Sequence, residues 1–468
     1  MKNMKHQPML EKEKQYKNLL TQNPQKFIIM AFISLFFLSS LLIAINVNPS
    51  IIPDEEGHLL YSFHFSNTWG IPDDNDETAE WGWYIKQNPF VYYWINGRII
   101  NLLSFVLPKI DQSQIIISLR ILNVLYSLGT VLFCYLISNE LIHDKWWQLL
   151  PVFLLTQTLM FVFLSSGISY DNLANFLSIS GIFFLVKVFK KNNFITNSLA
   201  WILCISLGTL VKYTVLPLAL FMAISWLIFI ILNKTEIFPI KAMTTKDLIL
   251  LLVVILLLIA NFLIYGVNLI NYQSIRPNCR DILEPEKCEI SQFAIGYQQY
   301  ALEEKLTLIE SIKLGYPNPI EYVSNIWIRN MLLRTYGILG HNIYYPVRLI
   351  NFYQLLFYLI IVLAIIFWKP SSFSISSLFG VIIFYTIVLL IKNYQSELIY
   401  GFSHFALQGR YIFPVIGPIY ILFTKILKST PSKYLRWAIL IFTIGLFIYG
   451  GPLTLILKYD TVFSSWFH

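Results

Sequence analysis

Residues 27–47 read FIIMAFISLFFLSSLLIAINV, and residues 53–58 read PDEEGH. The first stretch is apolar and long enough to cross the hydrocarbon core of a bilayer as one helix. The second places three carboxylates and an imidazole where the chain should leave the membrane. Ionisable groups at that boundary are costly unless they are solvated, paired or used. The order of the two stretches predicts an enzyme whose chemistry lies at the outer membrane face.

The composition is that of a chain mostly dissolved in lipid. Hydrophobic residues make up 56% of the 468 residues and charged residues 13%, and the mean hydropathy is +0.61. Soluble domains carry about 25% charged residues. We therefore expect an all-α polytopic membrane protein with no separate soluble domain of ordinary size.

Apolar runs of about 20 residues, the length that crosses a bilayer, predict eleven transmembrane helices. A division at Lys212 separates two of them. The predicted spans cover residues 27–47, 113–138, 148–166, 172–189, 195–211, 213–232, 247–270, 349–368, 374–392, 411–427 and 435–457.

The distribution of charge predicts the orientation of the chain. Cytoplasmic segments of membrane proteins carry an excess of Lys and Arg. Residues 1–26 and 233–246 are rich in Lys, whereas residues 48–112 are acidic. We therefore expect the N-terminus in the cytoplasm and residues 48–112 outside. The net charge of +8 then reflects topology, and it gives no reason to expect nucleic acid, which needs a clustered basic face.

Two predicted outer segments are too long to be turns, and long ordered segments between spans are usually functional. In the first, 48–112, the aromatic run Asn88–Trp94 is typical of an interfacial helix. In the second, 271–348, the pattern predicts amphipathic helices over 300–314 and 320–339. The chain therefore divides into a cytoplasmic tail (1–26), a transmembrane module (27–270), the second outer loop (271–348) and C-terminal transmembrane helices (349–468).

Cys279 and Cys288 share the second outer loop, which would face an oxidising compartment. We predict a short disulfide between them in preference to metal binding.

The acidic motif predicts general base catalysis. A hydroxyl or amine acceptor loses its proton as it attacks, and the carboxylate of Asp54 or Glu55 can accept that proton. Glu56 or His58 could orient the base, or His58 could be a second polar contact to substrate. The alternative is that these acids only solvate a helix end. Glu55 and His58 as a pair are too few ligands for a metal site, so we expect no metal there.

Asp171 and Lys212 also fall at predicted outer ends of helices. Asp171 could be a second acid that holds the acceptor or orients a basic residue, or it could be an ordinary helix cap. Lys212 could contact a phosphate, or it could extend its charge to the membrane surface.

Arg410 lies at the outer start of a predicted helix, between Gly409 and Tyr411. A guanidinium group presents a fixed fork of donors that suits phosphate oxygens. We therefore predict a substrate-binding role for Arg410 with Tyr411, the alternative being an anchor at the headgroups. Arg329 and Arg334 are weaker candidates for phosphate contacts.

Together these residues resemble a family. The acidic pair after the first helix, the aromatic first outer loop and the multi-helix body resemble the GT-C glycosyltransferases, which include protein O-mannosyltransferases and the aminoarabinose transferase of lipid A. Three motifs, Pro53-Asp54-Glu55 with His58, Ser169-Tyr170-Asp171, and Gln408-Gly409-Arg410-Tyr411 with Pro414, resemble more closely a bacterial family of multi-pass proteins of unknown function grouped with them. The resemblance covers roughly residues 27–425.

The resemblance implies transfer of a sugar from a polyprenyl-phosphate donor, with inversion, at the extracytoplasmic face of a bacterial plasma membrane. It implies a catalytic Asp in the first outer loop, which by position is Asp54, with Glu55 as its neighbour. The acceptor would be a glycan, a lipid or a protein. The acidic metal cluster of an oligosaccharyltransferase is not evident in the sequence, so we expect a metal-independent reaction without a cofactor. The alternatives are a lipid-linked glycan flippase or transporter, or a polymerase or ligase of surface polysaccharide.

Overall fold

The computed structural model describes residues 24–49, 51–75, 78, 80, 84–233, 243–277, 279–283, 286, 288, 307–339, 343–344, 347–370, 372–400, 407–462 and 464–466. Most of the predicted N-terminal tail and the first part of the predicted helix over 300–314 lie outside these residues.

The prediction of an all-α chain with many membrane spans is confirmed. Among the described residues, ten helical segments are long and apolar enough to cross a membrane. They are α2 (Pro24–Asn46), α6 (Gln112–Leu141), α9 (Tyr170–Phe189), α10 (Phe194–Val211), η2 (Tyr213–Val215) with α11 (Leu216–Leu232), α12 (Thr245–Asn261) with η4 (Phe262–Gly266) and α13 (Val267–Tyr272), α20 (Val347–Phe367), α21 (Phe373–Tyr400), η6 (Gly409–Ile412) with α22 (Phe413–Ser429), and α23 (Lys433–Tyr449) with α24 (Pro452–Val462).

Residues 148–166 differ from the single span that the sequence predicts. They form two short helices, α7 (Leu149–Thr156) and α8 (Leu159–Ser165), separated by an extended residue, Thr158. The Thr158 hydroxyl bonds to the carbonyl of Leu154 at 2.8 Å and to the Tyr420 hydroxyl at 2.6 Å. A side-chain hydroxyl that bonds locally to the backbone competes with the helical pattern, and this accounts for the break inside an apolar run.

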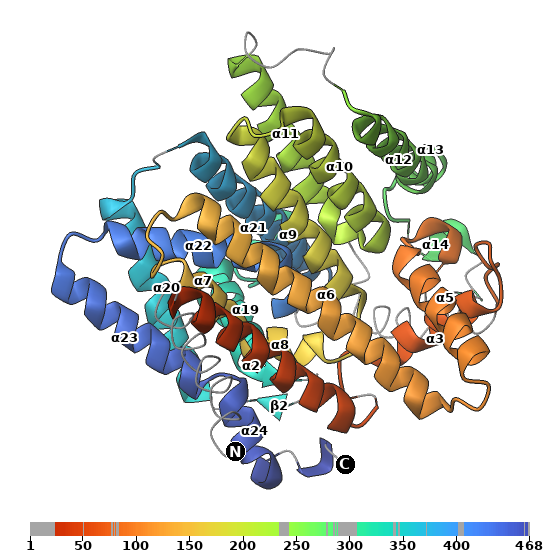
Figure 1. Ribbon diagram of the computed structural model, residues 1–468, viewed down its shortest axis with the longest axis horizontal. Helices are drawn as coiled ribbons and strands as arrows, with labels where there is room; N and C mark the ends of the chain where they lie inside the picture. The colour runs from red at the N-terminus through yellow and green to blue at the C-terminus, as the bar shows by residue number, and fades with distance from the viewer. Residues whose placement is uncertain are drawn as a thin grey trace, which may run out of the picture.

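The core of the bundle is formed by α9 and α22, with α6 and α10 beside α9 (Figure 1). Within their most apolar windows, 78% of α9 and 72% of α22 is buried, against 17% of α12. The exposed residues of α12 are mostly Leu and Ile. Such a surface is stable in hydrocarbon, where apolar side chains meet a matching solvent.

Two helices of the segment 48–112 pack against each other at one side of the bundle, α3 (Glu55–Ser66) and α5 (Val91–Val106) (Figure 1). They cross at Gly97, where a Cβ atom would lie 2.7 Å from the backbone of Phe65. The aromatic run predicted at headgroup depth begins α5, but Tyr92 and Tyr93 are buried in the protein. The exposed apolar residues of this helix, such as Phe105, lie at its other end.

The described part of the segment between α13 and α20 consists of short elements. Its first helix begins at Cys279, which forms a disulfide with Cys288 with the two Cα atoms 5.7 Å apart. The helix predicted over 320–339 is not one continuous α-helix, because a π-helical segment, η5, lies between two α-helical segments. The described elements are α14 (Cys279–Ile282), α17 (Leu308–Lys313), α18 (Pro319–Glu321), η5 (Tyr322–Trp327), α19 (Ile328–Tyr336), β1 (Ile338–Leu339) and β2 (Ile343–Tyr344), and β1 pairs antiparallel with β2.

Candidate active site

Asp54 precedes the first residue of α3 and has left-handed backbone angles, with φ 62° and ψ 10°. Few residues other than glycine adopt this conformation. The carboxylate does not cap the helix and instead forms an ion pair with Arg410, 356 residues away. The Asp54 side chain is 34% exposed, whereas that of Arg410 is buried. Asp54 therefore presents the accessible side of this pair.

Arg410 lies in the 3-10 turn η6, which leads into the buried helix α22. Gly409 lets this turn approach α19, because a Cβ atom there would lie 2.4 Å from the backbone carbonyl carbon of Arg334. One guanidinium nitrogen, Nη2, contacts Asp54, and Nε is 3.7 Å from Oδ2 of Asp171. Among the described residues, Nε and Nη1 find no hydrogen-bond partner. A buried donor without a partner costs free energy, so these two nitrogens suit a ligand.

Asp171 and Lys212 form a second buried ion pair. Asp171 is in the first turn of α9, and its backbone N–H donates to the Ser169 hydroxyl at 3.3 Å. Lys212 is the extended residue between α10 and η2. Its ammonium lies 4.5 Å from the centre of the Tyr170 ring and 4.7 Å from that of Tyr411. Two aromatic faces and one carboxylate thus hold this cation in place.

The four charged groups form a chain of alternating sign: Asp54, Arg410, Asp171 and Lys212. They come from four places in the sequence, at the starts of α3, α9 and η6 and at the end of α10. Arg410 is the central cation, because it lies between the two carboxylates. The chain places an accessible acid beside a cation that has unused hydrogen-bond donors.

His58 lies one turn along α3 from Asp54 and is buried among tyrosine rings. Its Nδ1 is 2.9 Å from the Tyr93 hydroxyl, and the ring meets that of Tyr170 edge-on with the ring centres 4.5 Å apart. Burial lowers the pKa of His58 to about 4, although the charge of Asp54 opposes the shift. The imidazole is therefore neutral near pH 7. Among the described residues, its Nε2 has no hydrogen-bond partner, so a neutral imidazole is available to a polar group of a substrate.

Glu55 turns away from this chain and pairs with Arg120 of α6. The Arg120 Nε and Nη2 atoms donate to the two carboxylate oxygens at 2.8 and 2.6 Å, and both side chains are buried. Sequence reasoning missed Arg120, although a signal was present: it is a charged residue within the predicted span 113–138. An ionisable residue inside a span suggests a buried partner.

Asn123, one helical turn after Arg120, supports the loop before α9. Its Oδ1 accepts hydrogen bonds from the Ser169 backbone N–H at 3.3 Å, from Asn172 Nδ2 at 3.1 Å and from the Tyr92 hydroxyl at 3.1 Å. Buried polar networks of this kind hold a unique geometry when their groups are satisfied. The network therefore ties the backbone of Ser169 and the side chain of Asn172, on either side of Asp171, to α6.

The structure brings together most of the residues predicted for the site. Arg410 and Lys212 are among the charges that act on His58, and Tyr411 covers Lys212. The two weaker candidates are different: Arg329 is exposed on α19, and the backbone of Arg334 packs against Gly409.

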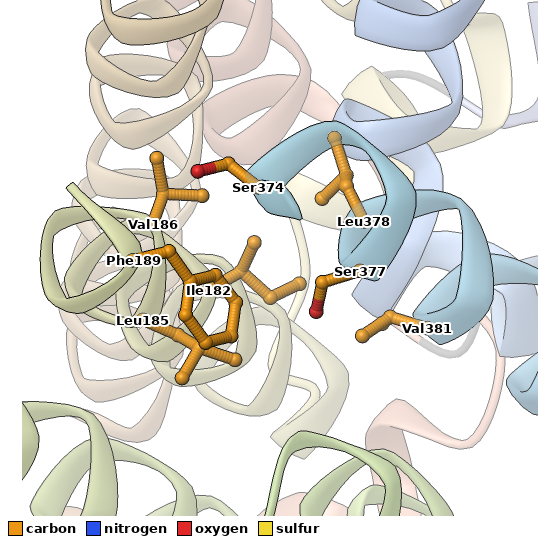
Figure 2. A pocket seen from close by; sticks show the side chains of 8 residues that line it. All are labelled: Ile182, Leu185, Val186, Phe189, Ser374, Ser377, Leu378 and Val381. Atoms are coloured by element: carbon orange, nitrogen blue, oxygen red, sulfur yellow. The ribbon is translucent and has the colours of Figure 1, made fainter. Parts of the chain in front are cut away.

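The small cavity of Figure 2 is not part of this site. It lies between the C-terminal half of α9 and the start of α21 and is lined by Ile182, Leu185, Val186, Phe189, Ser374, Ser377, Leu378 and Val381. Its volume of about 10 Å³ is close to the least that holds one water molecule. Asp171 is at the opposite end of α9, about 17–27 Å from these lining residues of α9 by the rise of a helix. This cavity therefore has no place in the chemistry of the charged chain.

Comparisons with known proteins give structural likenesses alone. No family model and no curated protein matches the chain. ArnT from Cupriavidus metallidurans bound to undecaprenyl phosphate is 10% identical over 89% of this chain and 62% of ArnT, with a TM-score of 0.46. The archaeal oligosaccharyltransferase AglB from Archaeoglobus fulgidus, in complex with an inhibitory peptide and a dolichol phosphate, is 12% identical over 93% of this chain and 56% of AglB, with a TM-score of 0.48.

The apo form of the A. fulgidus oligosaccharyltransferase gives 14% identity and a TM-score of 0.47 over 93% of this chain and 58% of the other. The chain thus spans about three fifths of the length of these proteins. At TM-scores below 0.5 these likenesses carry no weight for function, and the geometry of the site carries it instead.

Proposed function

We propose that this protein is a membrane glycosyltransferase of the GT-C type that moves a sugar from a polyprenyl-phosphate-linked donor to an acceptor. One observation carries the proposal. The buried guanidinium of Arg410 has two nitrogens, Nε and Nη1, that make no hydrogen bond within the described residues, and it lies against the accessible carboxylate of Asp54.

Arg410 is suited to the phosphate of the donor. A guanidinium binds two phosphate oxygens through parallel N–H donors. Nε and Nη1 make no hydrogen bond within the described residues, and either one forms a parallel pair with Nη2 once Asp54 gives up that nitrogen. When the sugar leaves, the phosphate gains a negative charge, and a fixed cation in a buried site stabilises that charge. Lys212 adds a second positive charge behind Asp171. This pair of cations would make the polyprenyl phosphate a good leaving group.

Asp54 is suited to the role of general base. It is the accessible acid of the chain, with 34% of its side chain exposed, whereas Asp171 is buried. The acceptor oxygen or nitrogen would attack the anomeric carbon and give its proton to Asp54, while the bond from that carbon to the phosphate oxygen breaks. A single displacement of this kind inverts the anomeric centre. In this scheme Glu55 has a structural role, because both of its oxygens bond to Arg120.

The reaction proposed here uses no metal ion. Each acid of the chain already has a cation beside it, Arg410 for Asp54 and Lys212 for Asp171, and those cations would repel a divalent ion. Within the described part of the chain, no three His, Cys, Asp or Glu side chains are grouped as metal ligands usually are. The proposed location is the extracytoplasmic side of a bacterial plasma membrane, with the N-terminus in the cytoplasm, on the basis of the charge distribution in the sequence.

Binding of undecaprenyl phosphate tests the proposal without knowledge of the sugar. Arg410→Ala should weaken binding about 10- to 150-fold, because hydrogen bonds to a charged group contribute about 1.5–3 kcal/mol. The affinity of Arg410→Lys should lie between those of the wild type and Arg410→Ala, since lysine keeps the charge and loses the fork of donors. Arg436→Ala is the matched control, because Arg436 contacts the carbonyl of Lys428 at the other end of α22.

The measurement is the dissociation constant of undecaprenyl phosphate from each purified variant in nanodiscs. Equal affinity in the wild type and Arg410→Ala would refute a phosphate contact. An alternative in which Arg410 only anchors the helix end predicts that Lys replaces it fully. Mass spectrometry of surface and lipid-linked glycans from a deletion strain would then identify the sugar and the acceptor.

A further inference from the structure

Arg120 has an unusually complete set of hydrogen bonds for a buried arginine. Its side chain, on α6, is 2% exposed. Nε and Nη2 bind the Glu55 carboxylate as a fork, at 2.8 and 2.6 Å. No donor is left for a ligand, because the remaining N–H groups bond to the backbone. Arg120 therefore differs from Arg410, whose Nε and Nη1 are unused.

The remaining donors of Arg120 hold the end of α2. Nη1 donates to the carbonyl oxygens of Ala44 at 3.0 Å and Val47 at 2.8 Å, and Nη2 lies 3.5 Å from that of Asn48. Carbonyls at the C-terminus of a helix lack partners within the helix, and a cation there also opposes the negative end of the helix dipole. Arg120 thus fixes the direction in which the chain leaves α2 toward Asp54.

Glu55 also connects Arg120 to a third segment, the loop before α9. Its Oε1 also accepts a hydrogen bond from the backbone N–H of Ile168 at 3.0 Å. The neighbouring Gly167 packs tightly on Ile52, where a Cβ atom would lie 2.3 Å from Cγ2 of that residue. The loop before α9 and the linker before α3 are therefore pressed together beside the buried ion pair.

Both acids of the candidate site lie close in the sequence to the residues that these hydrogen bonds hold, Glu55 and Ile168. Asp54 directly precedes Glu55, and Asp171 is three residues after Ile168. Asp171 is in the first turn of α9, next to the loop that leads into the helix. Asp54 lies before α3 and has left-handed backbone angles, so no helix sets its position. A non-glycine residue keeps such angles only when its surroundings over-determine them. We infer that Arg120 is a positioning residue, which holds Asp54 and Asp171 on either side of Arg410 through Glu55.

This inference rests on the proposed function, because its effect is read through the binding of a phosphate to Arg410. In the ligand-free protein, Asp54 occupies one nitrogen of Arg410. A phosphate must compete with that carboxylate. Loosening Asp54 therefore improves phosphate binding, whereas general damage to the fold weakens it. The sign of the change separates positioning from simple stability.

The experiment measures the dissociation constant of undecaprenyl phosphate for the wild type and for variants at positions 54, 55 and 120. Arg120→Lys should bind at least about twofold more tightly than the wild type, as expected for residues coupled in one network. Because Arg120 acts largely through Asp54, the same change made in an Asp54→Asn background should have a smaller effect. Equal effects in the two backgrounds, or weaker binding by Arg120→Lys in a protein that stays folded, would overturn the inference.

Glu55→Gln keeps the test valid if Arg120→Lys does not fold. It leaves the backbone bonds of Arg120 in place and keeps an acceptor for the Ile168 N–H, so it is the milder change. It should show the same tighter binding and the same dependence on Asp54. Glu140→Gln is the matched control. Glu140 is on α6, as Arg120 is, but it pairs with Lys187 and Lys190 at the far end of that helix. It should leave binding unchanged.

The two proposals fail in different ways. If undecaprenyl phosphate does not bind the wild type, or if Arg410→Ala binds it equally well, the proposed function fails. If the wild type binds and Arg410→Ala binds more weakly, but Arg120→Lys has the same effect with and without Asp54, the positioning role alone fails.

Discussion

Replacing Asp54 with Asn should make undecaprenyl phosphate bind more tightly, although it removes the proposed catalytic base. In the ligand-free protein the carboxylate of Asp54 is paired with Arg410, the group that we propose binds the phosphate. Two anions compete for one guanidinium. An Asn side chain has nearly the same shape but no charge, so it is a much weaker competitor.

The size of the effect follows from the burial of the two partners. A hydrogen bond between charged groups contributes about 1.5–3 kcal/mol. Arg410 is buried, but the Asp54 side chain is 34% exposed, and solvent reduces the strength of an exposed ion pair. About 1–2 kcal/mol is therefore expected, which corresponds to about five- to thirtyfold tighter binding. Transfer of the sugar should fall about a hundredfold to ten-thousandfold in the same variant, because its general base is lost.

The measurement is the dissociation constant in nanodiscs, with transfer followed separately once a donor is known. Asp73→Asn is the matched control: Asp73 is in the same segment and forms an ion pair with Lys86 at 2.6 Å, but both side chains are well exposed. It should change neither quantity. Weaker or unchanged binding by Asp54→Asn would refute competition between the carboxylate and the phosphate for Arg410.

Three further outcomes are expected. Gly409→Ala should lower the thermal stability and weaken undecaprenyl phosphate binding, because its Cβ would lie 2.4 Å from the α19 backbone, whereas Gly445→Ala, with open space around it, should not lower the stability. Since burial lowers the pKa of His58 to about 4, the unfolded chain binds more protons below pH 6.5. Stability should therefore fall by up to about 3 kcal/mol between pH 6.5 and 4, and His58→Gln should remove that loss in thermal unfolding. A maleimide should not label Cys279 or Cys288 in the denatured, unreduced protein, and labelling of both would contradict the disulfide.

Apolar length in the sequence predicts most of the spans, because the thickness of the bilayer sets how many apolar residues a crossing helix needs. The division at Lys212 is also visible in the sequence, since a charged residue ends an apolar run there. The break between α7 and α8 is not. It depends on the hydroxyl of Thr158 and its bond to Tyr420, 262 residues away, and hydropathy does not report such contacts.

The candidate site divides in the same way. Position in the sequence places Asp54, Asp171 and Arg410 at helix ends, and residue type predicts an acid and a phosphate-binding cation. The pairing itself depends on how distant helices pack, so the sequence does not distinguish Asp54 from Glu55 as the partner of Arg410. In the structure Arg120 pairs with Glu55, and Asp54 is therefore the acid that pairs with Arg410.

The alternating chain of charges at the site has no net charge, because Asp54 and Asp171 balance Arg410 and Lys212. The potential of such a set falls with distance faster than that of a single ion. Long-range electrostatic steering of anions needs a net field, and salt screens what remains beyond about 10 Å. An anionic lipid would therefore reach this site by lateral diffusion in the bilayer. Its capture rate would be nearly independent of ionic strength, because Arg410 would attract it only at contact distance.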